Sequence, residues 1–476
     1  WTKSEIIKMF TKTIHKLFKY QIKIKIYFIC ICFSFLYIFK NAEANNLPLI
    51  QDAEIETVIK KWAEPILIAA NLNPESINFY FINNNSINAF VAGGQNIFIN
   101  IGLIIKAEDH NALLGVIAHE AGHISGGHLI QTNKAINRAQ NTTIIATLIT
   151  AGLMAISHSK NLNIKGISKL ATIGPSIAER NFYKFSRENE RFADSAAIKY
   201  MKAVNRPIKP LANLLNKIGK QELLHENRQD PYLRTHPISR DRIAQIMNET
   251  KNEIKSDEYR NTQEKIQYNR IVAKIIAFTN PPGKTLLLYP KNNFSIEARY
   301  ARSIAYLRLP DFDKGIKEIS SLIKEYPEDP FFPELLGQMY FEDGELFESI
   351  QMYERAINKI PNNPIILLAL SRAQVEFGST EEILKAKNHL KSLLNIQEKN
   401  IAAWRLLSIV EARLDNIELA QLASAESYFL LNEYRLAIQF AEKARELFKK
   451  NSPNDIRAQD IIYFSNEKLK SLQNIN

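Results

Sequence analysis

The sequence predicts an α+β domain, mostly helical with a small sheet, followed by an all-α superhelix of repeated helix pairs. Two observations carry this prediction. In the first half, apolar residues change between helical and strand spacing, which is typical of a mixed fold. In the second half, proline turns recur 34 residues apart, at 327 and 361, a period typical of helix-pair repeats. The predicted segments are a leader at 1–44, the α+β domain at 45–279, a linker at 280–295 and the superhelix at 296–476.

Residues 1–44 are predicted to be a secretory signal peptide. Lysines precede an apolar stretch at 26–39, and Ala42-Glu43-Ala44 offers small residues for cleavage. The apolar stretch is shorter than the roughly 20 residues of a membrane-spanning helix, although an uncleaved anchor is the alternative. Both cysteines, Cys30 and Cys32, lie in this segment. The exported chain is therefore expected to contain no disulfide.

The charge of the chain argues against nucleic-acid binding. The net charge is +11, but residues 1–44 hold eight lysines against Glu5 and Glu43, which leaves about +5 (11 − 6) for the rest. No stripe of Arg and Lys with interleaved aromatic residues remains. A further apolar stretch at 142–156 is short for a membrane span. We expect a buried helix there, with a lid that touches a membrane surface as the alternative.

The repeats are strongest between the two proline turns. The large, small and turn positions of the tetratricopeptide (TPR) consensus are matched at Leu336, Gly337, Tyr340, Gly344, Tyr353, Ala356 and Pro361. About four such repeats fit between residues 296 and 450. Stacked helix pairs form a superhelix whose concave face binds peptides or partner proteins. The second domain is therefore predicted to be a binding module.

The segment His119-Glu120-Ala121-Gly122-His123 carries the chemistry of the first domain. On a helix, His119 and His123 lie one turn apart on the same face, so both can reach a single zinc ion. Glu120 lies beside them, where it can take a proton from a water whose pKa the metal lowers. The alternative is a pair of structural histidines, but these would be costly in so apolar a helix.

A catalytic zinc site needs three protein ligands and an open position. One candidate for the third ligand is His128, which follows His123 at a spacing one residue short of the HExxHxxGxxH pattern. Another is Glu190, with Asp194 one helical turn later. One of these carboxylates can bind the metal while the other accepts the ring N–H of a ligating histidine. The alternative for this pair is a solvated acidic edge matched to neighbouring arginines.

HExxH followed by Ser186-Arg187-x-x-Glu190-x-x-Ala193-Asp194 resembles the gluzincin family of zinc metalloproteases. The family includes HtpX, the CAAX prenyl protease and a BepA-like periplasmic branch with TPR repeats. The resemblance implies a gluzincin metalloprotease domain with zinc as its cofactor. It also implies that His119, His123 and Glu190 are the zinc ligands and that Glu120 is the general base.

Two further segments resemble the BepA-like branch. Residues 88–100 resemble its substrate-binding strand, an edge to which an extended peptide adds by β-augmentation. Thr235-His236-Pro237 with Arg242 resembles its THPxxxxR element. The resemblance assigns His236 a reversible place at the fourth zinc position, as a latch, whereas a simple turn histidine is the alternative. Arg242 is expected either to stabilise the oxyanion or to be a surface arginine, and His128 to be structural or to support a ligand.

The resemblance implies an exported zinc endopeptidase of the Gram-negative periplasm. Its substrates would be misfolded or stalled outer-membrane β-barrel proteins, and the TPR domain would bind these proteins or the barrel-assembly machinery. The alternative is a chaperone or assembly adaptor whose proteolysis is latent. A membrane-embedded protease is disfavoured because no apolar run of about twenty residues follows residue 44. Peripheral membrane contact is compatible with the sequence.

Overall fold

The fold is taken from a computed structural model. The described residues are 48–128, 177–223, 230–251 and 262–473. The predicted leader at 1–44 and the apolar stretch at 142–156 lie outside them. The described residues from Leu49 onward belong to one compact unit. No helix in this described part of the chain is both long and apolar enough to cross a membrane.

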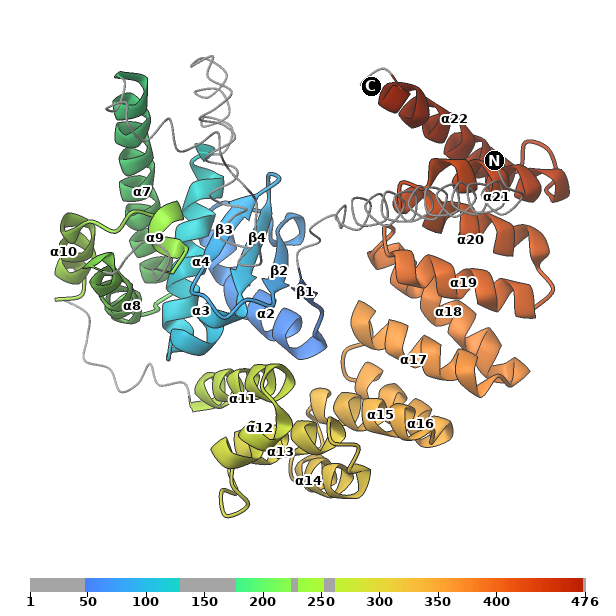
Figure 1. The fold of residues 1–476 in the computed structure, drawn as a ribbon, viewed down its shortest axis with the longest axis horizontal. Coiled ribbons are helices and arrows are strands. Elements are labelled where there is room, and N and C mark those ends of the chain that lie inside the picture. Colours follow the sequence, from blue (N-terminus) through green and yellow to red (C-terminus); the bar gives the residue numbers. More distant parts are fainter. Residues whose placement is uncertain (1–47, 129–176, 224–229, 252–261, 474–476) are drawn as a thin grey trace, which may run out of the picture. The chain divides into compact units, whose positions relative to one another are not determined.

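The first domain contains a four-stranded sheet in the order β1-β2-β4-β3 (Figure 1). The strands are β1 (Leu49–Ile50), β2 (Asn78–Ile82), β3 (Ala89–Ala92) and β4 (Asn96–Asn100). The central pair, β2 and β4, is parallel, whereas β1 and β3 pair antiparallel at the two edges. The sheet therefore exposes β3 as one of its edge strands, as expected for residues 88–100.

The single strand expected at residues 88–100 is wrong in one respect, because the segment forms a hairpin. β3 ends at Ala92 and β4 begins at Asn96. Between them, Gly93 and Gly94 adopt φ angles of +59° and +95°, which glycine reaches without the steric cost that a Cβ imposes. The two glycines thus turn the chain so that β3 and β4 lie side by side.

Helices make up most of the first domain. They are α2 (Ala53–Ala69), α3 (Ile101–Lys106), α4 (His110–Ser125), α7 (Ile177–Ala203), α8 (Lys209–Gly219), α9 (Tyr232–Thr235), α10 (Arg240–Glu249) and α11 (Thr262–Thr279), with 3-10 turns η2 (Pro74–Ser76) and η3 (Lys220–Leu223). Local sequence fixes where key helices begin. Asp52 accepts a hydrogen bond from the backbone N–H of Ile55 at the start of α2, and Asp109 accepts one from Asn111 at the start of α4.

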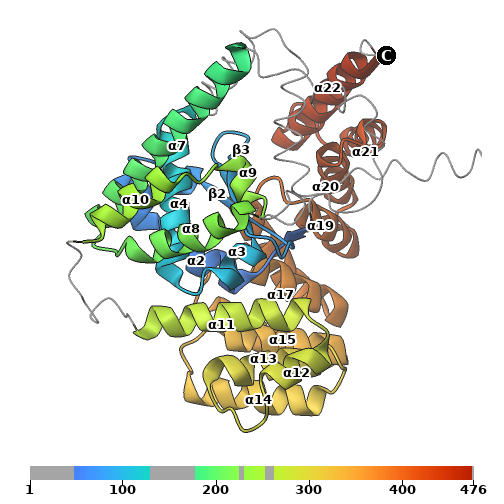
Figure 2. The same cartoon turned by 60° about the vertical axis from the view of Figure 1, so that its left-hand side comes forward.

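Helices α4 and α7 pack against each other (Figures 1 and 2). They lie close together at Gly122, where an added Cβ would be 3.0 Å from Cα of Ala193. A side chain there would require the neighbouring helix to move by a few tenths of an ångström. The contact brings the turn that carries His119 and His123 next to the turn that carries Glu190.

An all-helical region follows the first domain. The segment predicted as a linker contains a short helix, α12 (Pro282–Leu288). The repeats consist of α13 (Ile296–Leu307), α14 (Phe312–Glu325), α15 (Phe331–Asp343), α16 (Leu346–Ile357), α17 (Pro364–Phe377), α18 (Thr380–Ile396), α19 (Ile401–Arg413), α20 (Ile417–Leu430), α21 (Tyr434–Leu447) and α22 (Pro453–Gln473). Successive helices pack against each other. The predicted fold class, a mostly helical α+β domain followed by helical repeats, is confirmed.

Buried charges connect α2 and α11 to the first repeat. Glu54 of α2 is fully buried, pairs with Arg270 of α11, and accepts a hydrogen bond from the hydroxyl of Tyr300 of α13 at 3.0 Å. Burial alone would raise the pKa of Glu54, but Arg270 and Lys274 outweigh it and lower the pKa. Removing Glu54 or Arg270 would leave the opposite charge buried without a partner. These ion pairs therefore tie the packing of α2, α11 and α13 together.

Candidate active site

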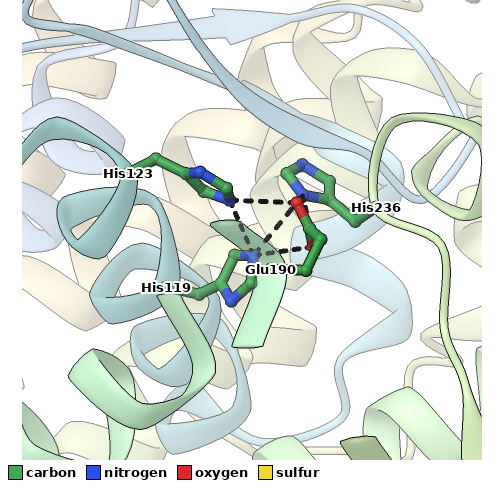
Figure 3. A group of neighbouring side chains, drawn as sticks. All are labelled: His119, His123, Glu190 and His236. Carbon is green, nitrogen blue, oxygen red and sulfur yellow. Dashed lines mark hydrogen bonds and ion pairs between the residues drawn. The ribbon is translucent and has the colours of Figure 1, made fainter. Parts of the chain in front are cut away.

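Three histidines and one carboxylate converge in the first domain (Figure 3). His119 and His123 come from α4, Glu190 comes from α7, and His236 directly follows α9. One ligand atom from each residue lies within 4.8 Å of the others. The structure thus brings together the residues predicted to bind the metal and the residue predicted to act as the latch.

Most of the distances between these four residues are close to those expected around one metal ion. Nε2 of His119 lies 3.1 Å from Nε2 of His123 and 3.4 Å from Nδ1 of His236. Each of these three nitrogens lies 3.2–3.4 Å from an oxygen of Glu190. Metal–ligand bonds of about 2.0–2.1 Å give tetrahedral ligand–ligand distances of about 3.3–3.4 Å. The four side chains are therefore already spaced as ligands of one ion.

Protonation of the cluster is shaped by burial and by its own charges. Burial alone would raise the pKa of Glu190, but the surrounding histidines hold it well below its ordinary value. Burial lowers the pKa of His123. Burial would also lower the pKa of His119, but hydrogen bonds to Asp194 and Glu190 raise it to about 10. A metal that binds here would compete with a proton for His119.

Asp194 and Arg242 support the cluster from behind. Oδ1 of Asp194 lies 3.0 Å from Nδ1 of His119, so the other ring nitrogen faces the centre. Arg242 donates from Nε and Nη2 to the two oxygens of Asp194, at 2.6 and 2.9 Å. Its Nη1 donates to the carbonyl oxygen of Pro237 at 2.6 Å and lies 2.9 Å from Oε2 of Glu190.

The geometry corrects one of the two expectations for Arg242. The side chain is not on the surface, since Arg242 is 3% exposed. Its donors contact Asp194, Glu190 and the carbonyl of Pro237, and its role at the oxyanion stays a prediction. It holds the carboxylates of α7 and the chain beside His236 in one hydrogen-bonded assembly.

Glu120 lies next to the cluster and is 1% exposed. Its Oε1 atom is 3.4 Å from Nε2 of His236 and has no hydrogen-bond partner among the described residues. The Glu120 carboxylate is therefore held inside the site, with Nε2 of His236 as its near neighbour. This is the position that a general base requires.

His128 lies behind His123 and outside the ligand group. Nδ1 of His128 is 3.0 Å from Nδ1 of His123, on the side of the ring away from Glu190. The ring of His128 also packs edge-on against Phe192, with 5.1 Å between the ring centroids. This is the place of a residue that orients a ligand. Among the described residues, the potential metal-binding group includes Glu190 and excludes His128.

The chain that leads to His236 runs beside Ile87, just before β3 begins. The backbone N–H of Ile87 donates to the Asp230 carboxylate at 2.7 Å, and that of Tyr232 donates to the Ile87 carbonyl at 3.3 Å. Nε2 of His236 lies 3.3 Å from the carbonyl oxygen of Ala89, and the ring of Tyr232 packs on that of His236. Sequence reasoning missed Asp230 and Tyr232 because neither belongs to a motif; only their closeness to the THP element could have marked them.

Comparisons with known proteins point to the same chemistry. Residues 49–250 match peptidase family M48. The chain is 23% identical over 419 residues to the beta-barrel assembly-enhancing protease of Escherichia coli K12, covering 86% of this chain and 82% of the relative. It is 25% identical over 444 residues to a Vibrio cholerae protein assigned the same name, covering 90% and 88%. The E. coli metalloprotease LoiP is 27% identical over 176 residues, covering 37% of this chain and 64% of LoiP.

The solved structures are more distant. The crystal structure of MamA aligns with a TM-score of 0.27 and 17% identity, over 36% of this chain and 96% of MamA. The crystal structure of yeast Tom70 aligns with a TM-score of 0.27 and 14% identity, over 79% of this chain and 87% of Tom70.

Proposed function

We propose that this chain, a metalloendopeptidase with an M48 domain at residues 49–250, uses zinc bound by His119, His123 and Glu190. The observation that carries the proposal is the convergence of three imidazoles and one carboxylate within 4.8 Å of one another, with the buried carboxylate of Glu120 beside them. A donor set of imidazoles and one carboxylate, without sulfur, is typical of catalytic zinc. The match to the peptidase family supports a bound metal. The choice of zinc among metals rests on the types of the ligand atoms.

The chain's own residues divide the work of peptide hydrolysis. Bound zinc would supply Lewis acidity that brings the pKa of a water towards neutrality. Glu120 accepts the proton of that water at Oε1 and can return it to the leaving amine. Asp194 fixes the tautomer of His119, and Arg242 fixes Asp194 through two hydrogen bonds.

We propose that His236 is a latch. Its Nδ1 atom lies beside His119 and Glu190, where it would hold the fourth position of a bound zinc and keep water out while the ring stays in place. Its Nε2 atom lies against Glu120 and the Ala89 carbonyl, which belong to the general base and to the edge strand. In the resting site, His236 therefore occupies the fourth ligand position and contacts both the general base and the edge strand. Movement of its side chain would free all three at once.

Substrate delivery follows from the edge position of β3. An extended polypeptide can add to that edge through backbone hydrogen bonds, close to the cluster because Ala89 contacts His236. The relatives named beta-barrel assembly-enhancing proteases support a role in quality control of outer-membrane protein assembly. We place the enzyme in the periplasm, with the TPR domain binding stalled barrel proteins or the assembly machinery. The closed latch also favours a second candidate, a TPR adaptor that is proteolytic only when opened.

His236→Ala tests this proposal. If the latch keeps 90–99% of molecules closed, removing the ring should raise casein digestion by roughly ten- to a hundredfold, because water and substrate gain access together. Zinc content should remain at one ion per chain, and a zinc chelator should abolish the gain. His389→Ala, a histidine change in α18 of the repeats, is the matched control and should leave digestion unchanged. Loss of cleavage in His236→Ala with zinc retained would instead make His236 a residue that stabilises the transition state.

A further inference from the structure

Three aromatic rings form a continuous row across the sheet of the first domain. Tyr80 of β2 stacks on Phe98 of β4, with 5.0 Å between centroids and 18° between ring planes. Phe98 stacks on Phe90 of β3, again at 5.0 Å, with 9° between planes. These residues are direct neighbours in the strand register. We call this row of Tyr80, Phe98 and Phe90 the aromatic row.

The aromatic row lies on the face of the sheet that is turned away from the core. Its three members are half-buried, whereas the residues that alternate with them, including Phe81, Ile97 and Ala89, are buried in the core. Since side chains of a strand alternate between faces, the row stands on the side away from that core. It ends at Phe90, on the edge strand.

The backbone of β3 shows how a further strand would be placed beside Phe90. The N–H of Asn100 donates to the carbonyl of Asn88, so Asn88 points its backbone groups towards β4. The antiparallel alternation then directs the backbone of Phe90 to β4 as well, and that of Ala89 and Val91 outwards. The backbone groups of Ile87 follow the same alternation. They point away from β4 and form hydrogen bonds with the Asp230 carboxylate and the backbone N–H of Tyr232.

A polypeptide bound through Ala89 and Val91 would therefore set one side chain directly opposite Phe90. Residues opposite each other share a face of the sheet and lie close enough to contact. Phe90 would offer that side chain a ring already held parallel to Phe98. Because Ala89 touches His236 of the metal cluster, this position is close to the bond that is cut.

We infer that Phe90 is a specificity-determining residue that selects an aromatic side chain in the substrate. The substrate ring becomes the fourth member of the aromatic row and stacks or packs edge-on against Phe90. The inference rests on the proposed function, because it assumes that substrates pair with β3 beside the metal cluster. It defines the substrate class as extended segments with an aromatic residue facing one side.

Outer-membrane β-strands fit this class. Their residues alternate between two faces, and aromatic residues gather in girdles near both ends of the strand. A strand left unpaired by failed assembly presents both features, a free backbone edge and an aromatic side chain. A strand already built into a barrel presents no free edge. The aromatic row would thus favour unassembled strands over finished barrels.

The test is a comparison of cleavage sites and of matched peptides in the zinc-loaded full chain carrying His236→Ala. Mapped cleavage of unfolded casein should show aromatic residues enriched at one fixed position near the cut bond. A peptide with Phe at that position should be cut with a kcat/KM about three- to tenfold above the same peptide with Leu. No positional preference, or equal rates for the two peptides, would overturn the inference.

Variants of the sheet residues test whether Phe90 causes the preference for an aromatic side chain in the substrate. Phe90→Leu should bring the Phe-to-Leu ratio close to one, and Phe90→Tyr should keep it, because tyrosine retains the ring. Phe79→Leu makes the same chemical change on the opposite face of β2 and should also keep the ratio. A preference that survives Phe90→Leu in a chain with normal zinc content and helical circular dichroism would contradict the assignment.

A binding experiment separates this inference from the proposed function. If the His236→Ala chain cuts no peptide, the proposed proteolysis fails. The aromatic preference is then measured as affinity, by fluorescence anisotropy of labelled peptides with a chain carrying Glu120→Gln and His236→Ala. A Kd for the Phe peptide about three- to tenfold below that of the Leu peptide supports the aromatic row. Equal affinities reject it.

Discussion

Replacing Glu120 with Gln should lower proteolysis by about a hundred- to ten-thousandfold, the usual contribution of a general base. The amide has nearly the shape of the carboxylate but cannot accept the proton of the attacking water. Glu120 is not among the four clustered residues, so the variant should keep its zinc. The effect is measured as casein digestion in the His236→Ala background, where the latch does not mask the rate.

Glu108→Gln provides the control for this prediction. Glu108 is an exposed carboxylate just before α4, paired with Lys217, and its loss should leave digestion unchanged. Digestion by Glu120→Gln at the rate of the parent chain would remove Glu120 from the mechanism. If the chain acts mainly as an adaptor, its cellular role would persist in Glu120→Gln although digestion is lost.

Replacing Glu190 with Gln should reduce zinc affinity by at least about ten- to a hundredfold, since changes to residues that merely support ligands already have effects of that size. The carboxylate lies 3.2–3.4 Å from all three histidine nitrogens and supplies the negative charge of the ligand group. The amide removes that charge and leaves Arg242 facing the site with one fewer acidic partner. Competition with a fluorescent zinc chelator measures the affinity.

The matched control is Glu188→Gln, which makes the same change at an exposed position of the same helix. It should bind zinc like the parent chain. Full zinc affinity in Glu190→Gln would show that another residue completes the site, and His128 would be the first to examine because it contacts His123.

Local patterns made much of the site predictable. The four-residue spacing of His119 and His123 already places both rings on one helical face. The same spacing places the carboxylates of Glu190 and Asp194 on one face. The M48 match and the relatives agree with the peptidase that these patterns predicted. Gly122 within the motif is explained only by the structure, where it permits the contact between α4 and α7.

Residues whose surroundings come from distant segments were not predictable in the same way. Arg242 bears no sign in the sequence that Asp194, Glu190 and the Pro237 carbonyl will occupy its donors. The aromatic row was equally hidden, because Phe90 and Phe98 become neighbours only through the turn at Gly93 and Gly94. Both cases depend on tertiary packing, which single-segment periodicity does not contain.

A zinc K-edge X-ray absorption spectrum of the purified chain tests the central claim most directly. The account predicts one zinc with three imidazole nitrogens and one carboxylate oxygen at about 2.0–2.2 Å, and no sulfur. The spectrum of His236→Ala should lose the scattering of one imidazole and gain a light atom in its place. A chain that binds no zinc, or whose zinc shows an oxygen shell without imidazole scattering, would contradict the assignment of His119, His123, Glu190 and His236 to one metal centre.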